Sequence, residues 1–196
     1  GETMRHIQST AIFIIFLISV STVAAAQARP GAFLKKQDKK LGPLLKDTEK
    51  NRAKILKIVN NLLDFQTLCK DSLGKHWETR TETDRMEFTN TLQALIEKNL
   101  VNRLKDSRDH KLVYGREEVT GQTASVVTVI APNDDPRAEQ TEIEYKLHRI
   151  GRDWSVIDMV TDGVSLVGNY RSQFNKIITE DGWDVLMKKM KDKLVE

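Results

Sequence analysis

The sequence contains few of the residues on which disulfides, metal sites and common catalytic motifs depend. It has one cysteine, Cys69, which excludes an intrachain disulfide, and only four histidines. His76, His110 and His148 show no metal-binding motif at helical spacing, so a zinc site is not indicated. No phosphate-binding glycine loop and no dinucleotide fingerprint occurs. An enzyme is therefore unsupported, although not excluded, and we identify no catalytic residue, no metal ligand and no cofactor.

Aromatic residues are also scarce, and neither sign of charge dominates. Aromatics make up 6% of the sequence, and the formal net charge is +3. No aromatic residue interleaves with a basic run, as a base-stacking surface would require, so nucleic-acid binding is not expected. Lysines cluster at 35–40 and at 188–193. We interpret both clusters as solvated helix faces, with attraction to an anionic membrane or an acidic partner as the second reading.

The longest apolar run lies near the start of the sequence. A short basic start, Met4-Arg5-His6, precedes the run AIFIIFLISV at 11–20 and the small-residue pattern AAAQA at 24–28. This order is typical of a secretory signal peptide, here cleaved after Ala26 or Ala28, and an uncleaved anchor is the alternative. The run is shorter than the roughly 20 apolar residues of a membrane span. We expect residues 1–28, with a short scar before Met4, to be a signal peptide, and residues 29–196 to form one soluble domain.

The expected domain divides by its hydrophobic period. Apolar residues recur at helical spacing from 31 to about 105, with breaks at Gly42-Pro43 and at Gly74. The period then becomes two, which predicts four strands, and helices are expected to follow. Their ranges are 111–119, 123–130, 140–150 and 154–161 for the strands, and 164–179 and 183–194 for the helices. The pattern predicts an α+β domain with a four-stranded, largely antiparallel sheet and helices at both ends of the chain.

The fourth expected strand is apolar on both faces. Strict alternation places Trp154, Val156 and Val160 on one face and Ile157 and Met159 on the other. Such strands occur where both faces of a sheet are covered. Two interpretations remain open: helices cover both sides of a solid core, or one face of the sheet lines an apolar cavity.

Arg171 borders the apolar stripe of the helix that follows the fourth strand. It comes four residues after Val167 and three before Phe174, and Asp162 is the expected N-cap of this helix. Two roles are open for Arg171. It is a structural clamp, paired with Asp158 or Asp162 and packed through its stem, or it contacts a phosphate or carboxylate with its guanidinium.

Three stretches carry a family resemblance. The most specific is GVSLVGNYRSQF at 163–174, in which Gly168 stands where a longer polar residue is common. The others are DFQTLCKDSLGKHW at 64–77 and DGWDVLMKKMKDKL at 181–194. Together they resemble the MlaC family of periplasmic phospholipid-binding proteins, also called toluene-tolerance proteins. The resemblance extends over essentially the whole expected domain.

The resemblance implies a soluble phospholipid carrier that is not an enzyme and needs no metal or cofactor. Such proteins carry phospholipid between an inner-membrane ABC transporter complex with a substrate-handling ring and an outer-membrane lipoprotein–porin complex, maintaining outer-membrane lipid asymmetry. The implied fold is a curved antiparallel sheet wrapped by helices around an apolar cavity, with the acyl tails inside and the head group near solvent. We expect a monomer in the periplasm of a Gram-negative bacterium. A periplasmic enzyme or a protein-binding adaptor with a cone-shaped pocket is the alternative.

The residues expected to bind lipid lie on the apolar faces of elements that should meet around the cavity. The resemblance does not assign them individually. Trp77 is a further candidate for the rim, and Arg171 is a candidate for the head-group contact or the structural clamp. The expected tail-binding residues are Leu92, Leu95, Val127, Val129, Ile143, Tyr145, Leu147, Trp154, Val156, Val160, Val164, Val167, Tyr170 and Phe174.

Overall fold

The computed structural model describes residues 28–106, 110–132 and 140–196, so the expected signal peptide lies outside the described residues, except for its last residue. Most of the loop between the second and third strands lies outside them as well. In chain order the elements are α1 (Pro30–Leu41), η1 (Gly42–Asp47), α2 (Thr48–Leu62), α3 (Phe65–Leu73), η2 (Gly74–His76), α4 (Glu82–Asp106), β1 (His110–Thr120), β2 (Thr123–Pro132), β3 (Thr141–Ile150), β4 (Asp153–Thr161), β5 (Val164–Ser165), α5 (Leu166–Asp181) and α6 (Trp183–Val195).

The α+β architecture predicted from the sequence is confirmed, with five strands in the described sheet and not four. The strands β1 to β5 pair antiparallel in the order of the sequence. The helix predicted from 164 begins instead at Leu166, because residues 164–165 pair with 160–161 of β4 as a two-residue strand. A strand of two residues has no periodicity that could distinguish it from a first helical turn.

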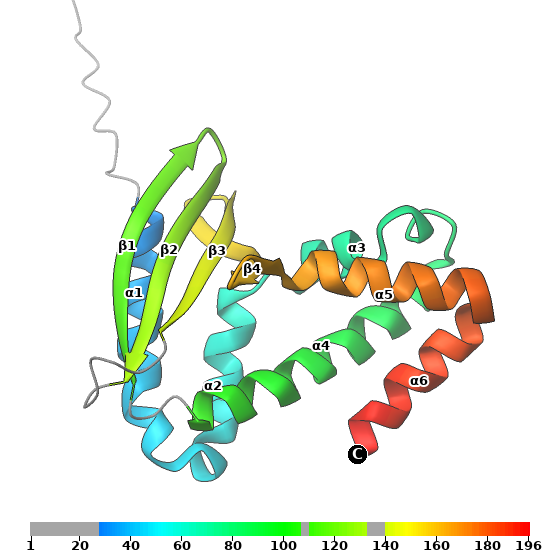
Figure 1. Cartoon of the computed structure of the whole chain (residues 1–196), viewed down its shortest axis with the longest axis horizontal. Helices are drawn as coiled ribbons and strands as arrows, with labels where there is room; N and C mark the ends of the chain where they lie inside the picture. The colour runs from blue at the N-terminus through cyan, green and yellow to red at the C-terminus, as the bar shows by residue number, and fades with distance from the viewer. Residues whose placement is uncertain (1–27, 107–109, 133–139) are drawn as a thin grey trace, which may run out of the picture.

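The helices lie against one face of the sheet and beyond its β4 edge (Figure 1). α1 runs along the sheet, whereas α3, α4, α5 and α6 extend past β4. The junction of α2 and α3 is joined to the β4 edge, where Leu63 forms a parallel bridge with Val156 and the N–H of Asp64 donates to Val156 O at 2.9 Å. The β4 edge therefore connects the sheet to the helical part of the protein.

A bulge in β4 determines which of its residues face the helices. The ladder between β3 and β4 skips Ile157, so the alternation reverses beyond it. Met159 consequently shares the helix-covered face, which we call the inner face, with Trp154 and Val156. Val160 lies on the opposite, outer face. The prediction that Val160 shares a face with Trp154 and Val156 is therefore wrong, because strict alternation does not allow for an extra residue.

The core lies between the inner face and the helices, and continues between the helices. Its largest fully buried side chains come from both layers: Trp154, Phe88, Ile55, Leu68, Leu73, Leu92, Leu147 and Leu186. Cys69 is also fully buried, with its Sγ 3.9 Å from Thr89 O. Burial raises the pKa of the Cys69 thiol to about 12, so this residue behaves as the small buried hydrophobe that its apolar surroundings predict.

The start of α5 is held by Ser165 and Asp158. Ser165, and not Asp162 as predicted, is the N-cap: its Oγ accepts from the N–H of Gly168 at 2.8 Å. The same hydroxyl donates to Asp158 Oδ2 at 2.7 Å, and Asp158 Oδ1 accepts from the N–H of Val167 at 3.1 Å. Asp162 instead lies in the turn after β4, with a φ of 48°. The buried carboxylate of Asp158 thus fixes α5 to β4.

Replacing Asp158 by alanine should therefore destabilise the protein. The buried N–H of Val167 would lose its acceptor, and we expect a loss of about 1–3 kcal/mol in the free energy of unfolding. Asp158→Asn keeps Oδ1 as an acceptor and should cost less. Urea denaturation followed by circular dichroism measures both variants. Unchanged stability of Asp158→Ala would contradict the role assigned to this carboxylate.

Asp64 ties the start of α3 to β3. Its Oδ1 accepts from the N–H of Thr67 at 3.1 Å, its Oδ2 accepts from the Thr67 hydroxyl at 2.6 Å, and His148 Nε2 lies 2.9 Å from Oδ2. Burial raises the pKa of this carboxyl, but the Thr67 hydrogen bonds and His148 together hold the pKa of Asp64 below its ordinary value. The charged form of Asp64 therefore stabilises the fold.

Asp64→Asn should make the stability less dependent on pH in the acid range. The pKa of Asp64 is lower in the folded protein than in the unfolded chain, where it is about 3.9. Its contribution is therefore present above the unfolded-state pKa and is lost as the pH falls through the folded-state pKa. The asparagine variant retains a capping oxygen but does not titrate. Urea midpoints from about pH 5 to pH 2 should fall less for the variant than for the wild type; parallel curves would contradict this assignment.

Candidate functional site

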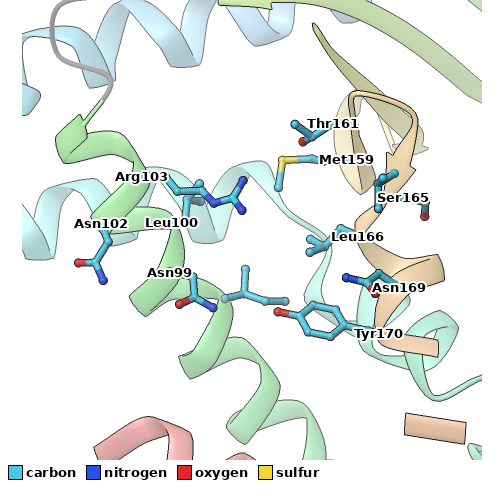
Figure 2. A pocket seen from close by; sticks show the side chains of 12 residues that line it. Asn99, Leu100, Asn102, Arg103, Met159, Thr161, Ser165, Leu166, Asn169 and Tyr170 are labelled. Carbon is cyan, nitrogen blue, oxygen red and sulfur yellow. The ribbon is translucent and has the colours of Figure 1, made fainter. Parts of the chain in front are cut away.

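A polar cavity lies between the C-terminal half of α4, the end of β4 and the start of α5. Its volume is about 660 Å³, within the range of roughly 300–1,000 Å³ that is usual for ligand pockets. Figure 2 shows side chains from these elements converging on it. The lining consists of Ile96, Asn99, Leu100, Asn102, Arg103, Met159, Thr161, Val164, Ser165, Leu166, Asn169 and Tyr170.

Arg103 is the only charged residue among the described residues that line this polar cavity. Its guanidinium is directed from α4 towards β4 across the cavity in Figure 2, and no carboxylate belongs to the part of the lining that the structure describes. Burial raises the pKa of Tyr170, although the charge of Arg103 and hydrogen bonding to Asn99 oppose the shift. The cavity thus offers one cation and several neutral hydrogen-bonding groups, which suits an anionic ligand group.

A second cavity lies under the sheet, between α1, η1 and strands β1 to β3. We call it the leucine cavity, and its volume is about 250 Å³. Its lining consists of Leu34, Gln37, Asp38, Leu41, Gly42, Leu45, Leu62, Leu104, Leu112, Tyr114, Ile130 and Tyr145. Burial raises the pKa of Asp38, and raises the pKa of Tyr145 to about 12. This lining is dominated by aliphatic side chains and suits a hydrocarbon ligand.

The polar and leucine cavities adjoin along the inner face. Tyr145 lines the leucine cavity and is the direct cross-strand partner of Met159, which lines the polar cavity. Such partners have their Cβ atoms about 5 Å apart. On α4 the successive residues Arg103 and Leu104 line one cavity each. The interior therefore has a polar end near α5 and an apolar end near α1, as an elongated amphiphile would require.

A third cavity, which we call the helical cavity, lies between α4, α5 and α6. Its volume is about 440 Å³, and it shares Asn99 and Tyr170 with the polar cavity. Three of the residues predicted to bind lipid, Leu95, Tyr170 and Phe174, line it. The Phe174 ring stacks on that of Tyr170, with centroids 5.3 Å apart. Tyr170 therefore lies between the helical cavity and the polar cavity.

The structure distributes the predicted tail-binding residues among cavities and core. Tyr145 lines the leucine cavity, Val164 and Tyr170 line the polar cavity, and Tyr170 also reaches the helical cavity. Ile143 lies half-buried on the inner face. The remaining inward residues are buried in the core without lining any of the three cavities: Leu92, Leu147, Trp154, Val156 and Val167. Lipid contact by the individual residues stays a prediction.

Three of the predicted residues lie on the wrong side of the sheet for these cavities. Val127 and Val160 are both partners of Glu144 across the ladders, and Val129 is the partner of Glu142. All of these residues are on the outer face, which alternates with the inner face along each strand. For β2 the sequence offers valine or isoleucine on both faces, so the side that meets the helices could not be identified from the pattern.

Arg171 joins α5 to α3. Its Nε donates to Asp71 O at 2.7 Å, and its stem packs over Gly74, whose φ is 57°. The predicted pairing with Asp158 or Asp162 is wrong, because the acceptor is this backbone carbonyl. Arg171 does not line any of the three cavities, so its position favours the structural clamp over the head-group contact.

Trp77 is likewise a core residue and lines none of the three cavities. It is 8% exposed, the guanidinium of Arg85 lies 5.5 Å from its ring centroid, and Arg85 Nε donates to Trp77 O at 2.9 Å. Its predicted place at the rim does not correspond to any of the cavities described above.

The polar residues of α4 were missed, although the sequence contains a signal for them. Asn99 and Arg103 continue the apolar stripe of this helix, seven and eleven residues after Leu92. In the structure both side chains are exposed to solvent, so they line the open part of the polar cavity. The leucine cavity was missed for a different reason. The helical period of the sequence includes the leucines of α1 and η1, but their packing against β1 and β2 depends on the tertiary structure.

Other classes of site find no support in the described part of the chain. Among residues 28–106, 110–132 and 140–196, no group of three or more histidine, cysteine or acidic side chains is placed to hold a metal ion. In the same ranges, each helix is too short or too polar to span a bilayer.

Comparisons with known proteins agree with this architecture. Seven chains of solved structures match. One is the phospholipid-binding protein from Ralstonia solanacearum in complex with a phospholipid, with a TM-score of 0.74 and 17% sequence identity. The match covers 86% of the present chain and 100% of the Ralstonia chain. No curated protein matches the sequence.

The fold and the cavities define an α+β protein with an amphipathic interior between a sheet and its covering helices. The family model of the MlaC protein matches residues 32–192, which is most of the chain. The chain therefore belongs to the MlaC family, as its sequence motifs indicate.

Proposed function

We propose that the protein is a periplasmic phospholipid carrier. The observation that carries this proposal is the junction of the polar cavity with the leucine cavity on the inner face of one sheet. Membership of the MlaC family supports it, as does the bound phospholipid of the Ralstonia protein with the same fold. The apolar run at 11–20 supports export from the cytoplasm.

The two cavities suggest an orientation for the ligand. The acyl tails would lie in the leucine cavity, and the phosphate would lie in the polar cavity within reach of Arg103. Burial of hydrocarbon contributes about 0.8 kcal/mol per CH₂, so two acyl chains would gain on the order of 20 kcal/mol relative to water. A carrier with its tails covered would therefore hardly release lipid into the aqueous phase.

Lipid exchange would therefore need a partner that also offers an apolar medium. Moving the tails from the cavity into a bilayer replaces one apolar environment by another, so the free-energy difference is small. We propose that the exchange partners are an inner-membrane ABC transporter complex and an outer-membrane lipoprotein–porin complex. The direction of transfer would come from these partners, because the carrier itself has no energy source.

A binding role is favoured over an enzymatic one by the chemistry of the polar cavity. Among the described residues, its lining contains no histidine, cysteine, aspartate or glutamate, which are the usual general acids, bases and strong nucleophiles. Asparagines and one arginine instead provide hydrogen bonds and charge. These groups hold a ligand without reacting with it.

Extraction of the purified protein with organic solvent, followed by mass spectrometry, tests the carrier proposal. We expect near-stoichiometric phospholipid after purification from cells in which the protein was exported. A protein that carries no lipid from this background, and that also takes up none from phospholipid vesicles, would contradict the proposal.

Substitutions at two neighbouring residues of β2 test where the acyl tails bind. Ile130 lines the leucine cavity, whereas Val129 lies on the outer face. Ile130→Trp should fill part of the cavity and reduce the bound phospholipid at least several-fold in the same extraction. Val129→Trp is the matched control and should retain it, provided that both variants give native circular dichroism. Equal retention by the two variants would place the tails elsewhere.

Arg103 is expected to contact the phosphate. Arg103→Gln removes the charge from the polar cavity and should weaken phospholipid uptake from vesicles about ten- to a hundredfold, since a charged hydrogen bond is worth about 1.5–3 kcal/mol. Arg103→Lys keeps the charge and should restore part of the affinity. A fluorescent phospholipid titrated into the delipidated protein measures the three affinities. Equal affinity of the wild type and Arg103→Gln would remove Arg103 from the head-group site.

A further inference from the structure

The two lysine-rich parts of the chain differ in how their charges are compensated. On α6, Lys188 Nζ lies 2.7 Å from Asp192 Oδ2 and Lys189 Nζ lies 2.9 Å from Asp181 Oδ2. Lys191 also forms an ion pair, with Glu87 of α4. The lysines of α6 are therefore largely neutralised by acidic neighbours on the helices around them.

The segment made of α1, η1 and α2 has no such compensation. Residues 29–62 contain ten lysines and arginines but three aspartates and glutamates, a formal net charge of +7, compared with +3 for the whole sequence. Of the ten cations, Arg29 is the one in an ion pair among the described residues, with Glu117. All the lysines from 35 to 57 are exposed. We call this exposed surface of residues 29–62 the basic surface.

The turn within the basic surface is apolar. η1 begins with Gly42 and the exposed Pro43, and continues with the half-buried Leu44 and Leu45. Gly42 and Leu45 line the leucine cavity. Figure 1 shows η1 as the loop that connects α1 to α2 at one extremity of the fold. The wall of the apolar cavity thus reaches the surface at a protruding turn, with lysines before and after it in the chain.

We propose that the basic surface docks on an anionic phospholipid bilayer, with the turn of η1 at the level of the head groups. Eight of its ten cations are lysines, whose ammonium groups act as point charges and do not require the planar fork geometry of a specific protein partner. Anionic bilayers attract such lysine-rich surfaces additively. The exposed Pro43 and the half-buried Leu44 and Leu45 beside the charges fit the boundary between head groups and acyl chains.

This docking extends the proposed function and does not depend on it. A bilayer is the medium with which a tail-binding cavity can exchange hydrocarbon, and the basic surface would bring the wall of the leucine cavity to that medium. Sedimentation with vesicles measures whether the protein attaches to a bilayer, whereas lipid extraction measures whether a lipid occupies the cavities. The two proposals can therefore fail separately.

Cosedimentation of the purified protein with vesicles tests the docking. We expect binding to mixed phosphatidylcholine–phosphatidylglycerol vesicles, little binding to pure phosphatidylcholine vesicles, and loss of binding as salt increases from about 0.05 to 0.5 M, because the Debye length falls below about 5 Å. Binding that is equal for both vesicle types, or that does not change with salt, would overturn the proposal.

Two triple variants with the same change of net charge provide the matched comparison. K36Q/K39Q/K46Q on the basic surface should lower the affinity for anionic vesicles at least tenfold, whereas K188Q/K189Q/K191Q on α6 should lower it less than threefold. Both should retain native circular dichroism and extracted phospholipid. Equal losses of affinity in the two variants would show that vesicle binding depends on the net charge of the protein and not on the basic surface. A third outcome is that the wild type fails to bind anionic vesicles but binds an immobilised acidic polypeptide, and that K36Q/K39Q/K46Q does not bind this polypeptide. This outcome would contradict docking on a bilayer and would indicate an acidic protein partner.

Discussion

The arrangement of the whole protein depends on hydrogen bonding at the edge of β4. On one half of this edge the junction of α2 and α3 is bonded to Val156, and on the other half β5 leads directly into α5. Asp158, which is buried between these contacts, binds the first turn of α5. Together with the core, these bonds hold the helical layer at the β4 edge, and the start of α5 that they fix forms one wall of the polar cavity.

The same construction explains how one interior can be polar at one end and apolar at the other. The polar side chains come from α4 and from the start of α5, and they lie beyond the β4 edge, where the chain changes from strand to helix. The leucines come from α1, η1 and the sheet itself. Different elements thus supply the polar residues of the polar cavity and the leucines of the leucine cavity. The cross-strand pair of Tyr145 and Met159 lies between the two cavities.

The sequence predicts the order and type of the elements well, because helical and strand periods are local properties. The predicted break of the helical pattern at Gly74 is confirmed, because α3 ends there, as is the antiparallel meander. The cavity walls were less predictable, because they depend on which face of each strand meets the helices. One extra residue, Ile157, reversed that assignment in β4. Arg171 illustrates the same limit: its partner is a backbone carbonyl of a helix 100 residues away in the chain, which no side-chain pattern could indicate.

The burial of Cys69 has a practical consequence for following the protein in solution. With a thiol pKa of about 12, almost no reactive thiolate exists near neutral pH while the residue stays enclosed between α3 and α4. The folded protein should accordingly resist oxidation to a disulfide-linked dimer. Alkylation of this single thiol would then occur only when α3 separates from α4, so its rate reports directly how often that part of the protein opens.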